Sequence, residues 1–202
     1  MVAWIWLILT SRAHWRNFVD TVKSFEEVGA PYQLHAGTLL GLVRDCALKS
    51  DLDFAVPRTW FTDDPTRVGQ LGRALKSRGF HYNFRFGTIQ EFGFEIAYAR
   101  DRLRVDIFTI DEIDTSFDWG YWRFDSGQHR CTVKRTSVED TFYWGNLTGL
   151  RIPMPVEDVL ESLYSKDWRA PTDNWPWTNI FSIGSCDPQG TKGYAKGFKR
   201  PS

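Results

Sequence analysis

The stretch covering residues 36–54 constrains the fold of this chain more than any other. A Gly37-Thr38 turn opens a short apolar helix, and Asp51 and Asp53 follow one residue apart at the start of a predicted strand. Alternate residues of a strand point to one face at about 3.3 Å rise per residue, so the two carboxylates project together about 6–7 Å apart along the chain. Such a pair near a helix N-terminus suits Mg²⁺ or Mn²⁺, while backbone N–H groups of the turn suit phosphate. The pair on its own is also typical of a solvated strand end.

A third carboxylate lies in a later stretch that alternates polar and apolar residues. Residues 102–108 read Arg-Leu-Arg-Val-Asp-Ile-Phe, which predicts a half-buried strand. Asp106 on a strand beside Asp51 and Asp53 would complete a two-metal site, the arrangement that stabilises both the attacking and the leaving oxygen in phosphoryl transfer. Arg104 shares the face of Asp106, so we expect it either to neutralise that carboxylate or to contact a donor phosphate.

Other candidates for substrate binding surround the acidic pair. Gly37 allows a close backbone approach to a ligand, and Thr38 is expected to cap the following helix or to hold phosphate oxygens. Arg44 near the helix end and Lys49 before the strand are each expected to meet a diphosphate or to be solvated. The predicted substrate-binding residues are therefore Gly37, Thr38, Arg44, Lys49 and Arg104.

Periodicity places these residues in a small domain. Apolar residues at 3–4 spacing predict a covering helix over 12–29 and a second helix over 64–79. Alternation predicts a strand at 32–35 and a three-stranded meander that carries Asp106. Within these strands, His35 is expected to be a core or rim histidine. Glu95 is expected to be a surface or paired glutamate, with a further carboxylate of the site as the alternative. A further strand and helix are expected over 149–164, and no periodicity is present beyond residue 169.

Composition limits the functional classes. The 202 residues fit one domain, and the 25 basic and 25 acidic side chains give no basic excess, so no nucleic-acid partner is expected. Most of the ten Trp are expected in the core, with a minority lining a sugar or nucleotide groove. The three cysteines contain no Cys-x-x-Cys pair, which argues against a zinc ribbon and leaves open one disulfide plus a free thiol or a fully reduced chain.

The N-terminal residues 2–9 are apolar but too few to span a bilayer, which needs about 20 residues. They lack the basic start of a signal peptide. Three interpretations stay open for this segment, namely a buried strand or helix turn, the remnant of a longer anchor, and an exposed patch.

The order of Gly37-Thr38, Asp51-x-Asp53 and the Asp106 strand is similar to the nucleotidyltransferase fold. The longer texts GTLLGLVRDCALKSDLDFAV, VDIF and IPMPVEDVLESLYSKDW resemble the LicD/fukutin family, over residues 34–177. Many LicD-type members carry a denser acidic run where this chain has Lys49-Ser50, and the form Asp-Leu-Asp-Phe-Ala looks closer to the fukutin side. This difference at Lys49-Ser50 affects the expected donor substrate more than the expected phospho-transfer reaction.

The resemblance implies an α+β fold, a nucleotidyltransferase-like mixed sheet flanked by helices with a small C-terminal helical or loop extension. It divides the chain into an N-terminal apolar segment and covering helix (1–30), a LicD/fukutin-like catalytic domain (31–168) and a Trp-, Gly- and Lys-rich tail (169–202). The implied activity is metal-dependent transfer of a phospho-substituent, such as ribitol phosphate or phosphocholine, from a CDP-linked donor to a glycan or glycoconjugate hydroxyl. Asp51, Asp53 and Asp106 are the expected catalytic residues and the ligands of Mg²⁺ or Mn²⁺.

Other functions remain open at the level of sequence. A non-catalytic binding or scaffold protein of the same fold is one, and a nucleotidyltransferase that moves NMP to a small acceptor is another, with diphosphate rather than CMP as its product. A Trp-rich carbohydrate-binding module would need no metal. The resemblance also implies membrane association through a missing or shortened N-terminal anchor, in the Golgi or ER of a eukaryote, whereas a bacterial chain would be cytoplasmic.

Overall fold

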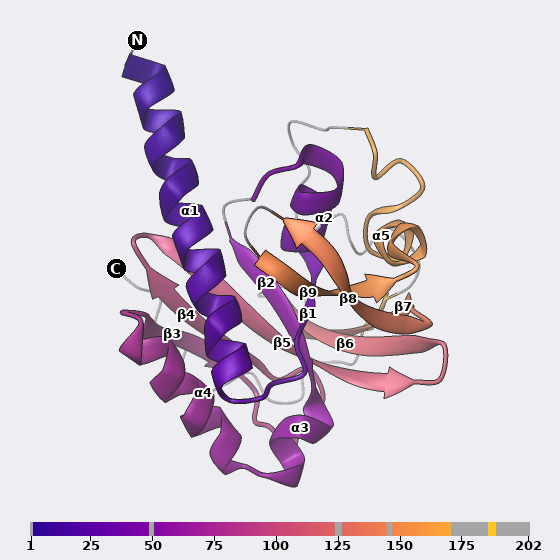
Figure 1. Ribbon diagram of the computed structural model, residues 1–202. Coiled ribbons are helices and arrows are strands. Elements are labelled where there is room, and N and C mark those ends of the chain that lie inside the picture. The colour runs from indigo at the N-terminus through magenta and orange to yellow at the C-terminus, as the bar shows by residue number, and fades with distance from the viewer. Residues whose placement is uncertain (1, 49–50, 124–126, 145–146, 171–185, 189–202) are drawn as a thin grey trace.

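The computed structural model describes residues 2–48, 51–123, 127–144, 147–170 and 186–188 (Figure 1). The helices are α1 (Val2–Glu27), α2 (Ala36–Asp45), α3 (Arg58–Asp63), α4 (Thr66–Ser77) and α5 (Val156–Tyr164). The strands are β1 (Gln33–Leu34), β2 (Leu52–Pro57), β3 (His81–Phe86), β4 (Glu95–Arg100), β5 (Leu103–Ile113), β6 (Ser116–Arg123), β7 (Gly127–Lys134), β8 (Ser137–Trp144), β9 (Leu147–Met154) and β10 (Cys186–Pro188).

The described strands form a mixed sheet in the order β1-β2-β5-β6-β7-β10, with β4 pairing β5 and β3 pairing β4 on a branch. The pair β2 and β5 is parallel, and the other pairs are antiparallel. A separate ladder joins β8 to β9. The predicted α+β class, with a mixed sheet flanked by helices, is confirmed, and the predicted meander corresponds to β3, β4 and β5.

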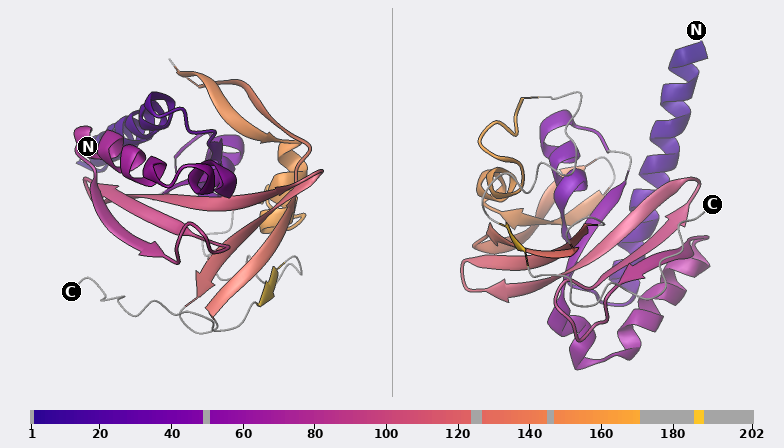
Figure 2. Two further views of the ribbon diagram at one scale, coloured as in Figure 1. Left: turned by 90° about the horizontal axis from the view of Figure 1, so that it is seen from below. Right: turned by 180° about the vertical axis from the view of Figure 1, so that it is seen from behind.

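One face of the sheet is covered by α1 and α4, which Figure 2 shows on one side of the strands. Leu52, Phe54 and Val56 alternate along β2 toward this side and are fully buried. The Phe54 ring centroid lies 5.8 Å from that of Phe18 and 5.2 Å from that of Phe25, both on α1. The period-two pattern of β2 therefore sends its apolar residues to the helices and leaves Asp51, Asp53 and Ala55 on the opposite face.

The opposite face of the sheet holds a second aromatic group around His35. The His35 ring makes edge contacts with Phe108, Phe117 and Trp119, and no hydrogen bond to either ring nitrogen is found in the described part of the chain. Burial lowers the pKa of His35 to about 3, so the imidazole is neutral at physiological pH. The prediction of a core histidine is confirmed.

Two predicted helices differ from the observed ones. Helix α1 begins at Val2 rather than at residue 12, and its first turns stand clear of the sheet in Figure 1. Among the described residues, none of the helices has both the length and the apolar character needed to cross a membrane. The predicted helix at 64–79 is α4, and the shorter α3 precedes it across Pro65, where the sequence indicated no helix.

The cysteines follow one of the two patterns left open by the sequence. Cys131 on β7 is disulfide-bonded, and Cys186 on β10 faces it across the antiparallel ladder. Cys46 is exposed and free. Beyond residue 170, only β10 lies within the described residues, so the predicted tail is otherwise outside them.

Candidate active site

The three predicted catalytic carboxylates meet on the sheet face that points away from α1. In the parallel pairing of β2 with β5, Asp53 lies directly opposite Asp106. Asp51 is two residues before Asp53 and therefore shares its face. The pairing of β2 with β5, which are separated by 45 residues of sequence, thus brings the acidic site (Asp51, Asp53 and Asp106) together.

Arg104 links two members of the acidic site. Its Nη2 donates to Asp51 Oδ2 at 2.9 Å, and its Nε donates to Asp106 Oδ2 at 2.8 Å. Arg104 is two residues before Asp106 on β5, so the period of the strand places its side chain on the same face. Two roles were expected for Arg104, and in this structure it neutralises carboxylates.

Asp53 is held by the turn that begins α2. The backbone N–H of Gly37 donates to Asp53 Oδ2 at 2.8 Å, and a Cβ at position 37 would lie 2.9 Å from the same oxygen. The close approach expected at Gly37 is therefore made to the carboxylate of Asp53. The hydroxyl of Thr38 accepts a hydrogen bond from the Asp53 backbone N–H at 2.7 Å.

The expected cap by Thr38 is wrong. Helix α2 starts at Ala36 with His35 as its N-cap residue, and Thr38 lies inside the first turn, fully buried. Its hydroxyl is used to fix the start of β2, because the helix and the strand cross at this point. Gly37 and Thr38 thus position Asp53 in this structure.

The remaining predicted binding residues differ in what they contact. Arg44 forms a two-pronged ion pair with its neighbour Asp45, at 2.8 and 2.9 Å, and donates to the backbone oxygen of Trp168 at 3.2 Å. These contacts connect the end of α2 to the segment after α5. Lys49 lies outside the described residues.

Burial and mutual repulsion disfavour ionisation of this site. Burial, with the nearby charges of Asp106 and Asp51, raises the pKa of Asp53 to about 8, although the Gly37 hydrogen bond opposes the shift. Burial also raises the pKa of Asp106 to about 6, and Arg104 limits that increase. The site therefore carries more carboxylates than one guanidinium can neutralise, which is the electrostatic setting in which a further cation binds favourably.

The donor chemistry of the acidic site fits a divalent cation. Carboxylate oxygens are the ligands that Mg²⁺ prefers, and Asp106 Oδ1 is buried with no hydrogen-bond partner in the described part of the chain. Within the described residues, no three acidic, histidine or cysteine side chains are already spaced around a single cation position. Arg104 holds Asp51 and Asp106 instead, so a cation would have to take over these contacts.

Glu95 is a further acidic residue on the face of the acidic site, which is one of the alternatives that the sequence left open for it. It is only 6% exposed, so the surface position, which was another of those alternatives, is wrong. In the ladder of β4 with β5, Ala97 pairs with Asp106, so Glu95 lies two residues along on the same face. Burial, followed by the charge of Asp106, raises the pKa of Glu95 well above its ordinary value. The alternation of Glu95, Ala97 and Ala99 in the predicted meander was the signal that could have placed Glu95 beside Asp106.

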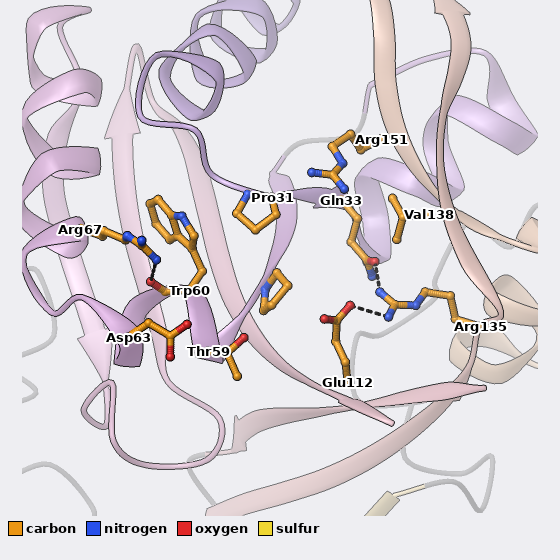
Figure 3. Close-up of a pocket in the computed structure, with 11 residues that line it drawn as sticks. Pro31, Gln33, Thr59, Trp60, Asp63, Arg67, Glu112, Arg135, Val138 and Arg151 are labelled. Carbon is orange, nitrogen blue, oxygen red and sulfur yellow. Dashed lines mark hydrogen bonds and ion pairs between the residues drawn. The ribbon is translucent and has the colours of Figure 1, made fainter. Parts of the chain in front are cut away.

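A pocket of about 290 Å³ lies at the other end of the same two strands (Figure 3). In this pocket, Arg135 donates to Gln33 Oε1 at 2.7 Å and to Glu112 Oε1 at 2.6 Å. Figure 3 shows these side chains facing Trp60 and Asp63 of α3 across the cavity. The other lining residues are Pro31, Pro57, Thr59, Arg67, Val138 and Arg151. Among the described residues, none of those predicted for the site lines this pocket.

Comparison with known proteins agrees with the motifs. No protein-family model matches the chain. The ribitol-5-phosphate transferases FKTN of Macaca fascicularis and Homo sapiens are each 24% identical to it over 164 residues, which is 77% of this chain. The chain resembles fukutin. The mouse fukutin is 23% identical over the same length. The matched stretch is 33% of each fukutin, so the chain spans about a third of the length of the curated relatives that it matches.

Solved structures of the antibiotic-resistance factor ANT(2'')-Ia are more distant. Its solution structure has a TM-score of 0.49 and 14% identity, and covers 86% of this chain and 82% of that chain. The crystal structure of ANT(2'')-Ia with adenylyl-2''-tobramycin has a TM-score of 0.46 and 14% identity, with coverages of 82% and 83%. At TM-scores below 0.5, this likeness says nothing about what the present chain binds.

Proposed function

We propose that this chain is a metal-dependent transferase that moves a phospho-substituent, such as ribitol phosphate, from a CDP-activated donor to a glycan hydroxyl. The observation that carries the proposal is the direct pairing of Asp53 with Asp106 across β2 and β5, with Asp51 on the same face. The fukutin relatives, named as ribitol-5-phosphate transferases, support the choice of substituent.

In the proposed reaction, an acceptor hydroxyl lies beside Asp106. Its oxygen attacks the phosphorus that bears the alditol, and its proton passes to the Asp106 carboxylate. The bond from that phosphorus to the bridging oxygen breaks, and CMP leaves with this oxygen. Bound Mg²⁺ or Mn²⁺ would supply charge neutralisation for the diphosphate, held by Asp51, Asp53 and Asp106.

The surrounding residues set the geometry for this step. Gly37 and Thr38 fix the side chain and the backbone of Asp53, which keeps one carboxylate in place as the site fills. Asp51 has 40% of its side chain exposed, against 4% for Asp106, so the donor diphosphate enters on the side of Asp51. Arg104 exchanges its carboxylate contacts for the phosphate oxygens of the donor.

Product analysis tests this proposal. The chain is incubated with Mn²⁺, a glycan acceptor and a panel of donors that includes CDP-ribitol, CDP-choline and the four NTPs. The expected result is release of CMP from a CDP-linked donor, together with an acceptor heavier by the phospho-substituent. Release of diphosphate from an NTP would instead assign the NMP-transfer reaction, and binding of donor without any product would assign a non-catalytic role.

A further inference from the structure

The sheet face of the acidic site continues across β4 to the edge strand β3. The register pairs Phe84 with Ala97, Ala97 with Asp106, and Asp106 with Asp53. The next row on the same face runs from Phe86 to Glu95 and on to Phe108. Two aromatic rings of β3 therefore lie on the same surface as the acidic site.

The spacing between the rings and the acids is set by the strands. Neighbouring strands are about 4.8 Å apart, so the Cα of Phe84 is about 10 Å from that of Asp106, two strands away. Between them, β4 contributes only the methyl group of Ala97 in this row. The centroids of the Phe84 and Phe86 rings are 5.0 Å apart at an interplanar angle of 56°, and both side chains are half-buried.

A polar group is present between the rings and the acidic site. Glu95 neighbours Phe86 directly and Asp106 diagonally, and no hydrogen bond to its carboxyl group is found in the described part of the chain. Arg104 also reaches this area, with its guanidinium carbon 5.7 Å from the centroid of Phe84. The surface thus combines apolar rings with a carboxyl group and a guanidinium group.

We propose that Phe84, Phe86 and Glu95 form the subsite for the sugar or alditol unit of the acceptor, beside Asp106. This proposal rests on the proposed function. Sugars and alditols present C–H faces that pack on aromatic rings and hydroxyl groups that donate to carboxylates, which is the combination found here. A unit packed on the rings has about 10 Å in which to extend a hydroxyl to Asp106.

The test replaces the rings while keeping apolar bulk. Phe86→Leu and Phe84→Leu are expected to raise the acceptor KM by about 3- to 10-fold each, the range for loss of one aromatic contact. In Phe86→Leu the donor KM stays unchanged, because Phe86 lies on the far side of Asp106 from β2. The effect of Phe86→Leu is the easier one to interpret, because the Phe84 ring also contacts Arg104.

Tyr82→Leu is the matched control. Tyr82 is on the same strand and is 55% exposed, but its register partner is Tyr98, so its ring lies on the helix-covered face. The acceptor KM is expected to stay unchanged in this variant. Glu95→Ala is expected to raise the acceptor KM, and Glu95→Gln to restore part of the loss because an amide oxygen still accepts a hydrogen bond.

Acceptor binding without turnover separates this proposal from the proposed function. Saturation-transfer NMR with ribitol, xylitol, glucose and N-acetylglucosamine is expected to show a signal that Phe86→Leu weakens and Tyr82→Leu preserves. The same result in a chain that turns over no CDP-linked donor would support the subsite and contradict the transferase reaction.

Two outcomes would overturn the subsite. One is normal turnover with an unchanged acceptor KM in Phe86→Leu, and the other is the absence of both signal and turnover in the unaltered chain. A change in sedimentation of Phe86→Leu with unchanged acceptor kinetics would assign the rings to self-association and also overturn it.

Discussion

The two ends of the β2–β5 pair are built from the same kinds of side chain but differ in charge balance. At the start of β2, the acidic site has one guanidinium for three carboxylates and leaves Asp106 Oδ1 without a hydrogen-bond partner among the described residues. At the far end, Arg135 divides its donors between Gln33 and Glu112. An arginine network can therefore serve structure or chemistry, and the excess of negative charge is what distinguishes the two ends.

The largest expected effect is at the acidic end. Asp53→Asn should lower phospho-transfer by about a thousandfold or more, because charge stabilisation worth several kcal/mol is lost. The fold should be retained, because Asn has the size of Asp and keeps an oxygen that can accept the hydrogen bond from the Gly37 N–H. Turnover with a CDP-linked donor and the Tm of the variant measure these two effects. Added Mn²⁺ should not rescue activity, and near-normal turnover would show that this end is not catalytic.

At the opposite end, Arg135→Met should act on stability. Gln33 Oε1 would lose its donor in a buried position, which costs about 1–3 kcal/mol of unfolding free energy. Urea unfolding measures this loss, and turnover per folded molecule should stay the same. Glu112→Gln serves as the milder control, because the Glu112 side chain is 49% exposed. If Arg135→Met instead lost activity at unchanged stability, the far end would belong to the reaction.

The link between α2 and the acidic site can be tested at Gly37. A Cβ at this position would lie 2.9 Å from Asp53 Oδ2 and displace the carboxylate. Gly37→Ala should lower turnover by about tenfold, the cost of misplacing a catalytic group by a fraction of an ångström. Gly69→Ala in α4 is the control, because its Cβ would meet only the mobile end of Arg73 at 3.4 Å. Equal effects of the two substitutions would argue against a positioning role for Gly37.

The smallest expected effect is the pH dependence of stability without metal. The pKa of Asp53 is about 8 in the folded state and 3.8 as its ordinary value, so the folded state binds more protons between these pH values. The free energy of unfolding contributed by this group is therefore greatest below pH 4 and falls as pH rises toward 8. Thermal unfolding in chelator at pH 5, 6.5 and 8 should show a Tm that decreases at each step, because all three pH values lie above the ordinary pKa of Asp53.

Asp53→Asn and added Mn²⁺ are the controls for that measurement. The variant should lose part of the pH dependence because the shifted group is gone. Mn²⁺ should raise the Tm at pH 8 more than at pH 5, since it binds the ionised carboxylates. An identical pH dependence in the variant would assign the slope to other groups.

The meeting of the acids could be predicted from the sequence by combining local strand rules with the resemblance to a known fold. Period two places Asp51 with Asp53 and Arg104 with Asp106, and the resemblance to a known fold supplied the pairing of the two strands. The partner of Gly37 was not predictable in the same way. The sequence indicated a close approach to a ligand, whereas the group that approaches is Asp53, sixteen residues further along the chain.

Features that depend on packing between residues far apart in the chain could not be predicted from the sequence. The bond from Arg135 to Gln33 joins residues 102 positions apart, and no periodicity links them. A surface position was one of the alternatives for Glu95, and glutamate is rarely buried without a partner. Its burial follows from the position of β4 between β3 and β5, which fixes its face but which composition does not reveal.

The placement of Arg104 on the same strand as Asp106 has a consequence for how the site fills. Because Arg104 is two residues from Asp106 on the same strand, its guanidinium group remains close to this carboxylate. A metal ion that binds Asp106 must therefore compete with Arg104 and not only with water. Under the proposed function, the displaced guanidinium group of Arg104 can bind the negatively charged phosphates of the nucleotide donor. The metal ion and the nucleotide donor then bind cooperatively, and the site with only one of them bound is not favoured.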